Sequence, residues 1–150
     1  MNNKKNIIKS VILAALVGTI TVLGLTILIY ATFFQNWLSA YVELTPDIVA
    51  IISRENVNMF TMIMANIAHG FLIAIVLYWG KFFTSKQGAV AAGTIAFLTE
   101  LYFCFSQYSI LKTMSLVTTI ADTCMWTFIN LFVGIAISWV YRKSLKSVSQ

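Results

Sequence analysis

The sequence is short of charge, of proline and of cysteine. Only 10% of its 150 residues are charged, whereas a soluble domain carries about 25%. One proline and seven glycines exclude a collagen-like or proline-rich chain, and two cysteines exclude a secreted scaffold held by disulfides. What the sequence has instead is 59% hydrophobic residues and a mean hydropathy of +0.85. The chain is therefore neither an ordinary cytosolic domain nor a disordered one.

Basic residues outnumber acidic ones by 10 to 5, which gives a pI of about 9.4. Such an excess is typical of proteins that bind nucleic acid, but most of these basic residues flank long apolar runs. This placement favours anchoring and orientation in a membrane. We therefore expect the lipid bilayer as a partner and no nucleic acid.

Four apolar runs are long enough to cross a bilayer. A spanning helix needs about 20 apolar residues, since each residue rises about 1.5 Å through about 30 Å of hydrocarbon. The first run is longer than the core of a cleavable signal peptide, so we expect it to be retained. The predicted fold class is all-α, a four-helix transmembrane bundle that forms a single integral membrane domain over residues 1–150, with an outer loop at 35–58. The expected helices cover about residues 10–34, 59–80, 88–108 and 118–140.

Lysines and arginines between the runs predict the orientation, because short cytoplasmic loops are enriched in them. If the N-terminus is inside, only Arg54 and Lys112 lie outside. We therefore expect both the N-terminus and the C-terminus to be cytoplasmic, with a bacterial inner (plasma) membrane as the location. The basic residues that then lie inside are Lys4, Lys5, Lys9, Lys81, Lys86, Arg142, Lys143 and Lys146.

The connections between the runs differ in length. Lys81–Gln87 and Ser109–Val117 are short, which predicts that the second, third and fourth helices are antiparallel neighbours. The first connection is longer and holds Thr45 before the single proline, a pattern typical of a helix start. We expect a short surface helix at about Pro46–Arg54.

Ionisable residues at membrane depth are costly and usually face the bundle interior, so they are the candidates for function. Three qualify: His69, Glu100 and Asp122. If the second and third helices form an antiparallel hairpin centred near Thr84, His69 lies at the depth of Glu100. Helical periodicity also places Glu100 on a stripe with small residues, which let neighbouring backbones approach closely. We therefore expect Glu100 to face the interior of the bundle.

Two asparagines extend this polar set, because Asn66 stands one turn from His69 and Asn130 stands two turns from Asp122. The five side chains are expected to converge on an outward-opening cavity that binds a small ligand or a proton. This candidate site consists of Asn66, His69, Glu100, Asp122 and Asn130.

Each of these residues also has a structural interpretation. A membrane histidine or asparagine commonly forms hydrogen bonds between helices without binding a ligand. Asp122 near the start of the fourth helix can cap that helix, where negative charge is favoured. Glu100 must be paired or protonated, and a functional and a structural role fit it equally well.

No catalytic, metal or cofactor motif is present in the sequence. Cys104 and Cys124 share no C-x-x-C motif, so we expect two buried free thiols in place of a redox pair. One histidine cannot form a His-x-x-x-His site, and no glycine-rich nucleotide-binding loop occurs. We expect no metal, no cofactor and no catalytic residue.

The segment from Asn66 to Tyr141 carries several recognisable patterns. They are Asn66-x-x-x-Gly70, Glu100 with Tyr108 beyond it, Ala121-Asp122, and Gly134 followed by Trp139-Val140-Tyr141. With these patterns the chain resembles small four-helix bacterial membrane proteins that are known as hypothetical proteins. The resemblance covers about the last two thirds of the chain. It implies the same architecture and no established activity.

Three classes of function remain open from the sequence. The first is a non-enzymatic membrane protein that binds or conducts a small ligand or proton at the polar site. The alternative is a structural or accessory subunit without a ligand site, either a homo-oligomer or part of a larger membrane complex. The third is a membrane enzyme with Glu100 and His69 as acid and base, for which few polar groups converge.

Overall fold

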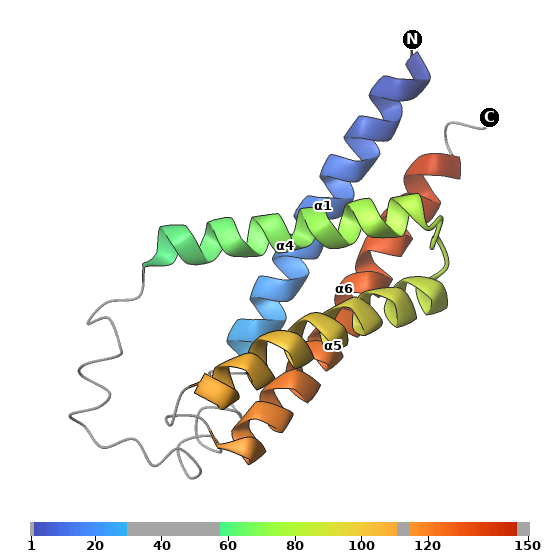
Figure 1. The fold of residues 1–150 in the computed structure, drawn as a ribbon. Helices are drawn as coiled ribbons and strands as arrows, with labels where there is room; N and C mark the ends of the chain where they lie inside the picture. The colour runs from blue at the N-terminus through green and yellow to red at the C-terminus, as the bar shows by residue number, and fades with distance from the viewer. Residues whose placement is uncertain (1, 30–57, 111–114, 147–150) are drawn as a thin grey trace.

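The described part of the chain is entirely helical. The computed structural model describes residues 2–29, 58–110 and 115–146. These residues contain no strand, which confirms the predicted all-α class for this part of the chain. The surface helix expected at Pro46–Arg54 lies outside the described residues. Figure 1 shows the four helices, α1 (Asn2–Ile29), α4 (Met59–Trp79), α5 (Ser85–Ile110) and α6 (Leu116–Lys146).

All four helices are long and apolar enough to cross a membrane, as the sequence predicted. The candidate membrane spans within them have 24, 21, 26 and 29 residues, and about 20 residues are needed to cross the hydrocarbon. Large apolar side chains such as Phe60, Tyr102 and Ile110 are more than 70% exposed in the isolated chain. An exterior of this kind is typical of helices that face lipid.

Capping residues set where the helices begin. Thr84 and Gln87 form a capping box, in which each side chain accepts a hydrogen bond from the other residue's backbone N–H, at 3.4 and 3.3 Å. Ser115 and Thr118 form a second box with both distances at 3.1 Å. The third helix therefore begins at Ser85, three residues before the apolar run that was expected to start it. Asn58 caps α4 at the predicted position by accepting from the backbone of Thr61.

Charged residues end an apolar run without ending the helix that contains it. The fourth helix was expected over 118–140, yet α6 continues to Lys146. Lys143 lies with Nζ 4.0 Å from the centre of the Trp139 ring, an arrangement that lets a cation stay on a helix at the membrane boundary. The first helix likewise begins at Asn2, before the apolar run at residue 10.

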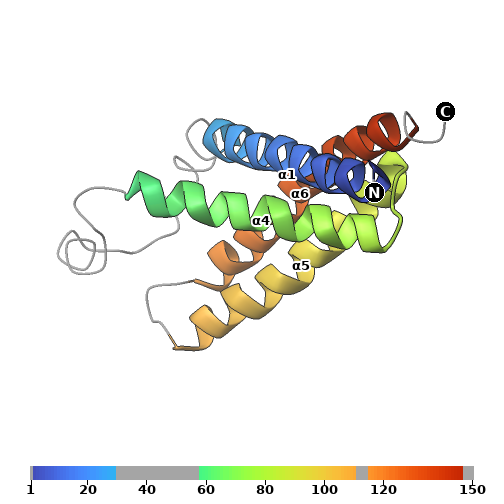
Figure 2. The same cartoon turned by 90° about the horizontal axis from the view of Figure 1, so that it is seen from above.

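The helices do not pack in the order of the chain. α5 and α6 form a closely packed antiparallel hairpin, as expected, whereas α4 packs mainly against α1. Figure 2 shows α4 and α5 diverging from the turn that joins them. The prediction that these two helices are packed neighbours is therefore wrong over most of their length. A short loop constrains only the ends that it joins, and Gly70 lets α4 approach Thr19 and the backbone of Ala15 in α1.

The start of α1, the end of α6 and the turn between α4 and α5 lie at the same end of the bundle (Figures 1 and 2). We call this the turn end and the opposite side the far end, where α5 finishes and α6 begins. Much of the buried apolar core lies in the turn-end half of α6, against α1, α4 and the first part of α5. Its α6 members are Ile129, Val133, Ile137, Val140 and Tyr141.

Candidate functional site

Two carboxyl groups and a thiol meet between α5 and α6. Sγ of Cys104 lies 3.4 Å from Oε2 of Glu100 and 3.7 Å from Oδ2 of Asp122, within the hydrogen-bonding range of sulfur. One ligand atom from each residue lies within 4.8 Å of the other two. Cys104 is only 2% exposed, and both acidic residues are partly buried. We call these three residues the acid–thiol cluster.

Helix periodicity and the α5–α6 hairpin together build this cluster. Glu100 and Cys104 are four residues apart on α5 and therefore lie on one face. In a hairpin centred near residue 113, Cys104 is level with Asp122 of α6. The predicted stripe of small residues is buried at Gly93 and Ala96, so α6 comes close enough for its side chain to reach α5.

A second polar contact joins α4 to α6. Nε2 of His69 lies 2.8 Å from Oδ1 of Asn130, whose side chain is completely buried. Since an amide oxygen only accepts, Nε2 carries the proton in this bond. The Asn130 amide donates in turn to the carbonyl of Trp126 at 3.0 Å, and the Trp126 ring meets the imidazole edge to face at 6.0 Å. His69 is thus held in one orientation by two partners on α6.

Asn66 contributes to the contact between α4 and α1. Its side chain donates to the carbonyl of Met62 at 2.8 Å, and its own carbonyl lies 3.4 Å from the hydroxyl of Thr19. These hydrogen bonds join it to its own helix and to α1. They do not link it to the acid–thiol cluster.

Glu100 on α5 has electrostatic interactions with a residue of each of the two polar groups, the acid–thiol cluster and the His69–Asn130 pair. It interacts electrostatically with Asp122 within the cluster and with His69 across the bundle. Four of the five candidate residues therefore form two adjacent groups. Glu100 and Asp122 meet at the thiol, and His69 meets Asn130.

Cys104 is the member of this site that the sequence analysis did not select. The sequence pattern placed it on the same helix stripe as Glu100, but a bond of its thiol was considered only with Cys124, which lies at a similar depth in the hairpin. The same relation places Cys104 level with Asp122, and the spacing of four residues places it beside Glu100, so the signal was present in the sequence. Both thiols are free, as predicted, but Cys124 is exposed and not buried.

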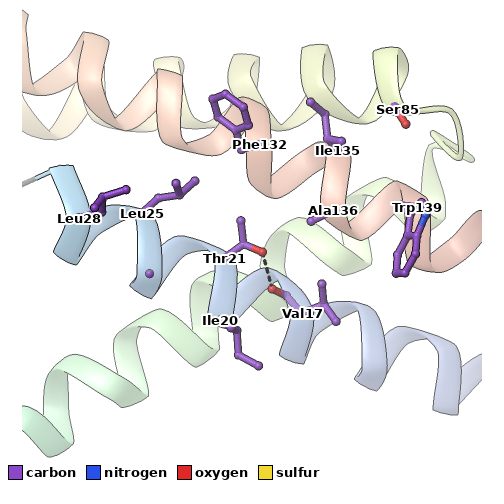
Figure 3. Close-up of a pocket in the computed structure, with 11 residues that line it drawn as sticks. Val17, Ile20, Thr21, Leu25, Leu28, Ser85, Phe132, Ile135, Ala136 and Trp139 are labelled. Carbon is purple, nitrogen blue, oxygen red and sulfur yellow. Dashed lines mark hydrogen bonds between the residues drawn. The ribbon is translucent and has the colours of Figure 1, made fainter.

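A separate groove of about 650 Å³ lies between α1 and α6 and is almost entirely apolar. Figure 3 shows its lining, in which Leu25 and Phe132 are typical residues and the Thr21 hydroxyl donates to the carbonyl of Val17 at 2.8 Å. A polar group that bonds its own helix in this way offers nothing to a ligand. None of the acid–thiol cluster lines this groove, which suits acyl chains better than a polar ligand.

The chemistry of the polar site follows from its charges. Between Gly88 and Ile110 and between Leu116 and Tyr141, no lysine or arginine is present to balance two carboxylates. Two carboxylates this close repel unless a proton or a cation lies between them. Comparison with known proteins found no match: no family model, no curated protein and no solved structure matches this chain.

Proposed function

We propose that the chain is a multi-pass membrane protein that binds a small cation or a proton inside its helical bundle. The observation that carries the proposal is the meeting of two carboxyl groups from different helices at one buried thiol. Such an arrangement is costly in a segment that contains no basic residue to balance it. A helix pair that needed only adhesion would be better served by neutral groups.

His69 and Asn130 have a positioning role in this proposal. The bond to Asn130 places a proton on Nε2 and fixes the orientation of the imidazole between α4 and α6. Asn66 contributes indirectly, by holding α4 against α1.

In the proposed arrangement the protein lies in a bacterial inner membrane, and both termini are on the cytoplasmic side. The eight-to-two distribution of lysines and arginines supports the orientation. The resemblance to small four-helix bacterial membrane proteins supports the location. Reporter fusions test this topology. Fusions after Ser149 and within Lys81–Gln87 should report cytoplasm, and one near Asp47 should report the outside; a cytoplasmic Asp47 overturns it.

Infrared difference spectroscopy of the full-length protein in lipid nanodiscs tests the proposed cation or proton binding. We expect a buried carboxyl band that responds to pH or to added cations in the wild type and is lost in Glu100→Gln. Gln keeps the shape and the hydrogen bonding of the side chain while it removes the charge. Asp47→Asn, which changes a carboxyl outside the four helices, is the matched control and should keep the band.

A structural role as an accessory subunit, alone as a homo-oligomer or within a larger complex, is the competing proposal. The hydrogen bonds of Thr19 with Asn66 and of His69 with Asn130 favour it, because each joins two helices. Under this role no buried carboxyl responds to protons or cations, and Glu100→Gln behaves like the wild type. Those two results together would end the ligand-binding proposal.

A further inference from the structure

Two of the three donor separations in the acid–thiol cluster match those around a tetrahedral metal ion. A zinc ion binds sulfur at about 2.3 Å and carboxylate oxygen at about 2.0–2.2 Å, so neighbouring donors around it lie about 3.3–3.7 Å apart. The two measured separations from Sγ of Cys104 are 3.4 Å to Glu100 and 3.7 Å to Asp122. Among the described residues, Glu100, Cys104 and Asp122 are the group of three potential metal ligands whose donor atoms lie within 4.8 Å of one another.

We propose that Glu100, Cys104 and Asp122 bind a divalent transition-metal ion of the zinc type. This inference rests on the proposed function, since both place a cation at Glu100, and it names the chemical class of that cation. It also replaces the expectation from sequence that the chain holds no metal. Three protein donors leave the fourth tetrahedral position to water or to a second small ligand.

The donor set selects among metals. Calcium needs six to eight oxygen ligands and magnesium prefers oxygen ligands in an octahedron, so neither suits three donors of which one is sulfur. Thiolate sulfur favours zinc and its neighbours, and a divalent ion reduces the total charge of the three ionised donors from −3 to −1. Binding breaks the S–H bond of Cys104, forms a metal–sulfur bond and releases the proton to solvent.

The surroundings of the cluster resemble the outer shell of a metal site. The Thr123 hydroxyl lies beside the Cys104 thiol and donates its proton to the carbonyl of Thr119. Hydrogen-bonded groups of this kind orient metal ligands and raise the affinity of the site. The donors also come from two helices that a tight hairpin already holds together, so little ordering is needed on binding.

Titration with cobalt(II) tests the inference, because cobalt(II) substitutes for zinc and absorbs light. We expect the metal-free, full-length protein in nanodiscs to bind one ion per chain with a thiolate-to-cobalt charge-transfer band that added Zn²⁺ removes. Cys104→Ser should abolish this band. Cys124→Ser is the matched control, since this thiol lies on α6 close to Asp122 but is exposed, and it should leave the band unchanged.

Loss of a carboxylate should weaken binding strongly. Even an outer-shell partner contributes about 10- to 100-fold to metal affinity, so Asp122→Asn should raise the dissociation constant for Co²⁺ by about 100-fold or more. Asp122→Asn also serves if Cys104→Ser fails to fold, as judged by circular dichroism and gel filtration. Unchanged affinity in a folded Asp122→Asn variant overturns the inference.

The infrared and cobalt measurements separate the inference from the function on which it rests. A wild-type carboxyl band that responds to pH, combined with no charge-transfer band, overturns the metal site and leaves a proton-binding function. A charge-transfer band that persists in Cys104→Ser also overturns the metal site. A band that requires Cys104 but not Cys124 supports it.

Discussion

The two halves of α6 bury different kinds of side chain. Toward the turn end its buried face is largely apolar, with Val133 and Ile137 completely inaccessible. Toward the far end the buried side chains of α6 are polar, with Thr119 and Thr123 almost completely inaccessible and Asp122 partly buried beside Thr123. One helix thus holds the bundle together with one half and presents the acid–thiol cluster with the other.

The turn-end half is stabilised by close backbone contact and satisfied hydrogen bonds. Gly134 packs against the backbone of Gly88, where no Cβ fits. The Ser138 hydroxyl donates to the carbonyl of Phe82 at 2.7 Å. The Tyr141 hydroxyl donates to a carbonyl of α4, also at 2.7 Å. Close packing and hydrogen bonds of this kind drive the association of helices in lipid. Burial of apolar surface does not drive it there, because the lipid tails are equally apolar.

In the far-end half of α6, threonine hydroxyls are hydrogen-bonded to the backbone of their own helix. The hydroxyls of Thr119, Thr123 and Thr127 donate to carbonyls four residues earlier in α6, at 2.8, 2.9 and 2.7 Å. These three donors are therefore used by their own helix. The closest backbone contacts and the acid–thiol cluster therefore lie in different halves of α6.

The largest loss of unfolding free energy is expected when the closest backbone contact of the turn-end half, between Gly134 and Gly88, is disrupted. Gly134→Ala places a Cβ against the carbonyl of Gly88 and should lower the free energy of unfolding by about 3 kcal/mol, since backbone must move. Unfolding in bicelles by denaturant or heat measures this. Gly24→Ala is the control, because nothing lies within 4 Å of that position. Equal stability of the two variants would break the comparison.

The second effect concerns the buried tyrosine at the turn end. Tyr141→Phe removes the hydrogen bond to Ala74 while it keeps the ring, and should cost about 1 kcal/mol of unfolding free energy. Tyr102→Phe provides a control on α5, because Tyr102 is 78% exposed. The same unfolding assay applies. A neutral Tyr141→Phe would show that apolar packing alone holds α6 to α4.

A smaller effect is expected for the polar contact between α4 and α6. A double-mutant cycle of His69→Ala and Asn130→Ala should give a coupling energy of about 0.6 kcal/mol, typical of hydrogen bonds between membrane helices. Unfolding free energies of the wild type, both single variants and the double variant provide the measurement. A coupling as large as the Gly134 effect would show that a polar contact contributes as much to stability as close backbone packing.

The smallest effect is expected in the turn between α4 and α5. Lys81 has φ of 55°, a left-handed conformation that costs an L-residue energy and that glycine adopts freely. Lys81→Gly should therefore raise the unfolding free energy by about 0.5 kcal/mol. The exposed Lys86→Gly lies within α5 and should lower it, because glycine is unfavourable in a helix. A destabilised Lys81→Gly would indicate that the lysine side chain contributes to the turn.

Much of the fold and part of the site could be predicted from the sequence. The approximate positions of the four helices in the described residues follow from apolar runs, because the hydrocarbon thickness sets a minimum length. The α5–α6 hairpin and the inward face of Glu100 follow from a short loop and helical periodicity. The spacing of Cys104 from Glu100 and Asp122 was equally available, but the thiol was compared only with the other thiol.

The partner of α4 was decided by tertiary packing. A loop of a few residues keeps the ends of α4 and α5 together, but side-chain volumes decide which helices touch beyond the turn. Gly70 opens room for Thr19 on α1, and the resulting crossing directs His69 to Asn130 on α6. Apolar periodicity cannot reveal this choice, since lipid and protein interior are equally apolar. The apolar runs of the sequence locate the described helices, whereas the packing of these helices in three dimensions decides which polar residues meet, because packing depends on side-chain shape and not on hydropathy.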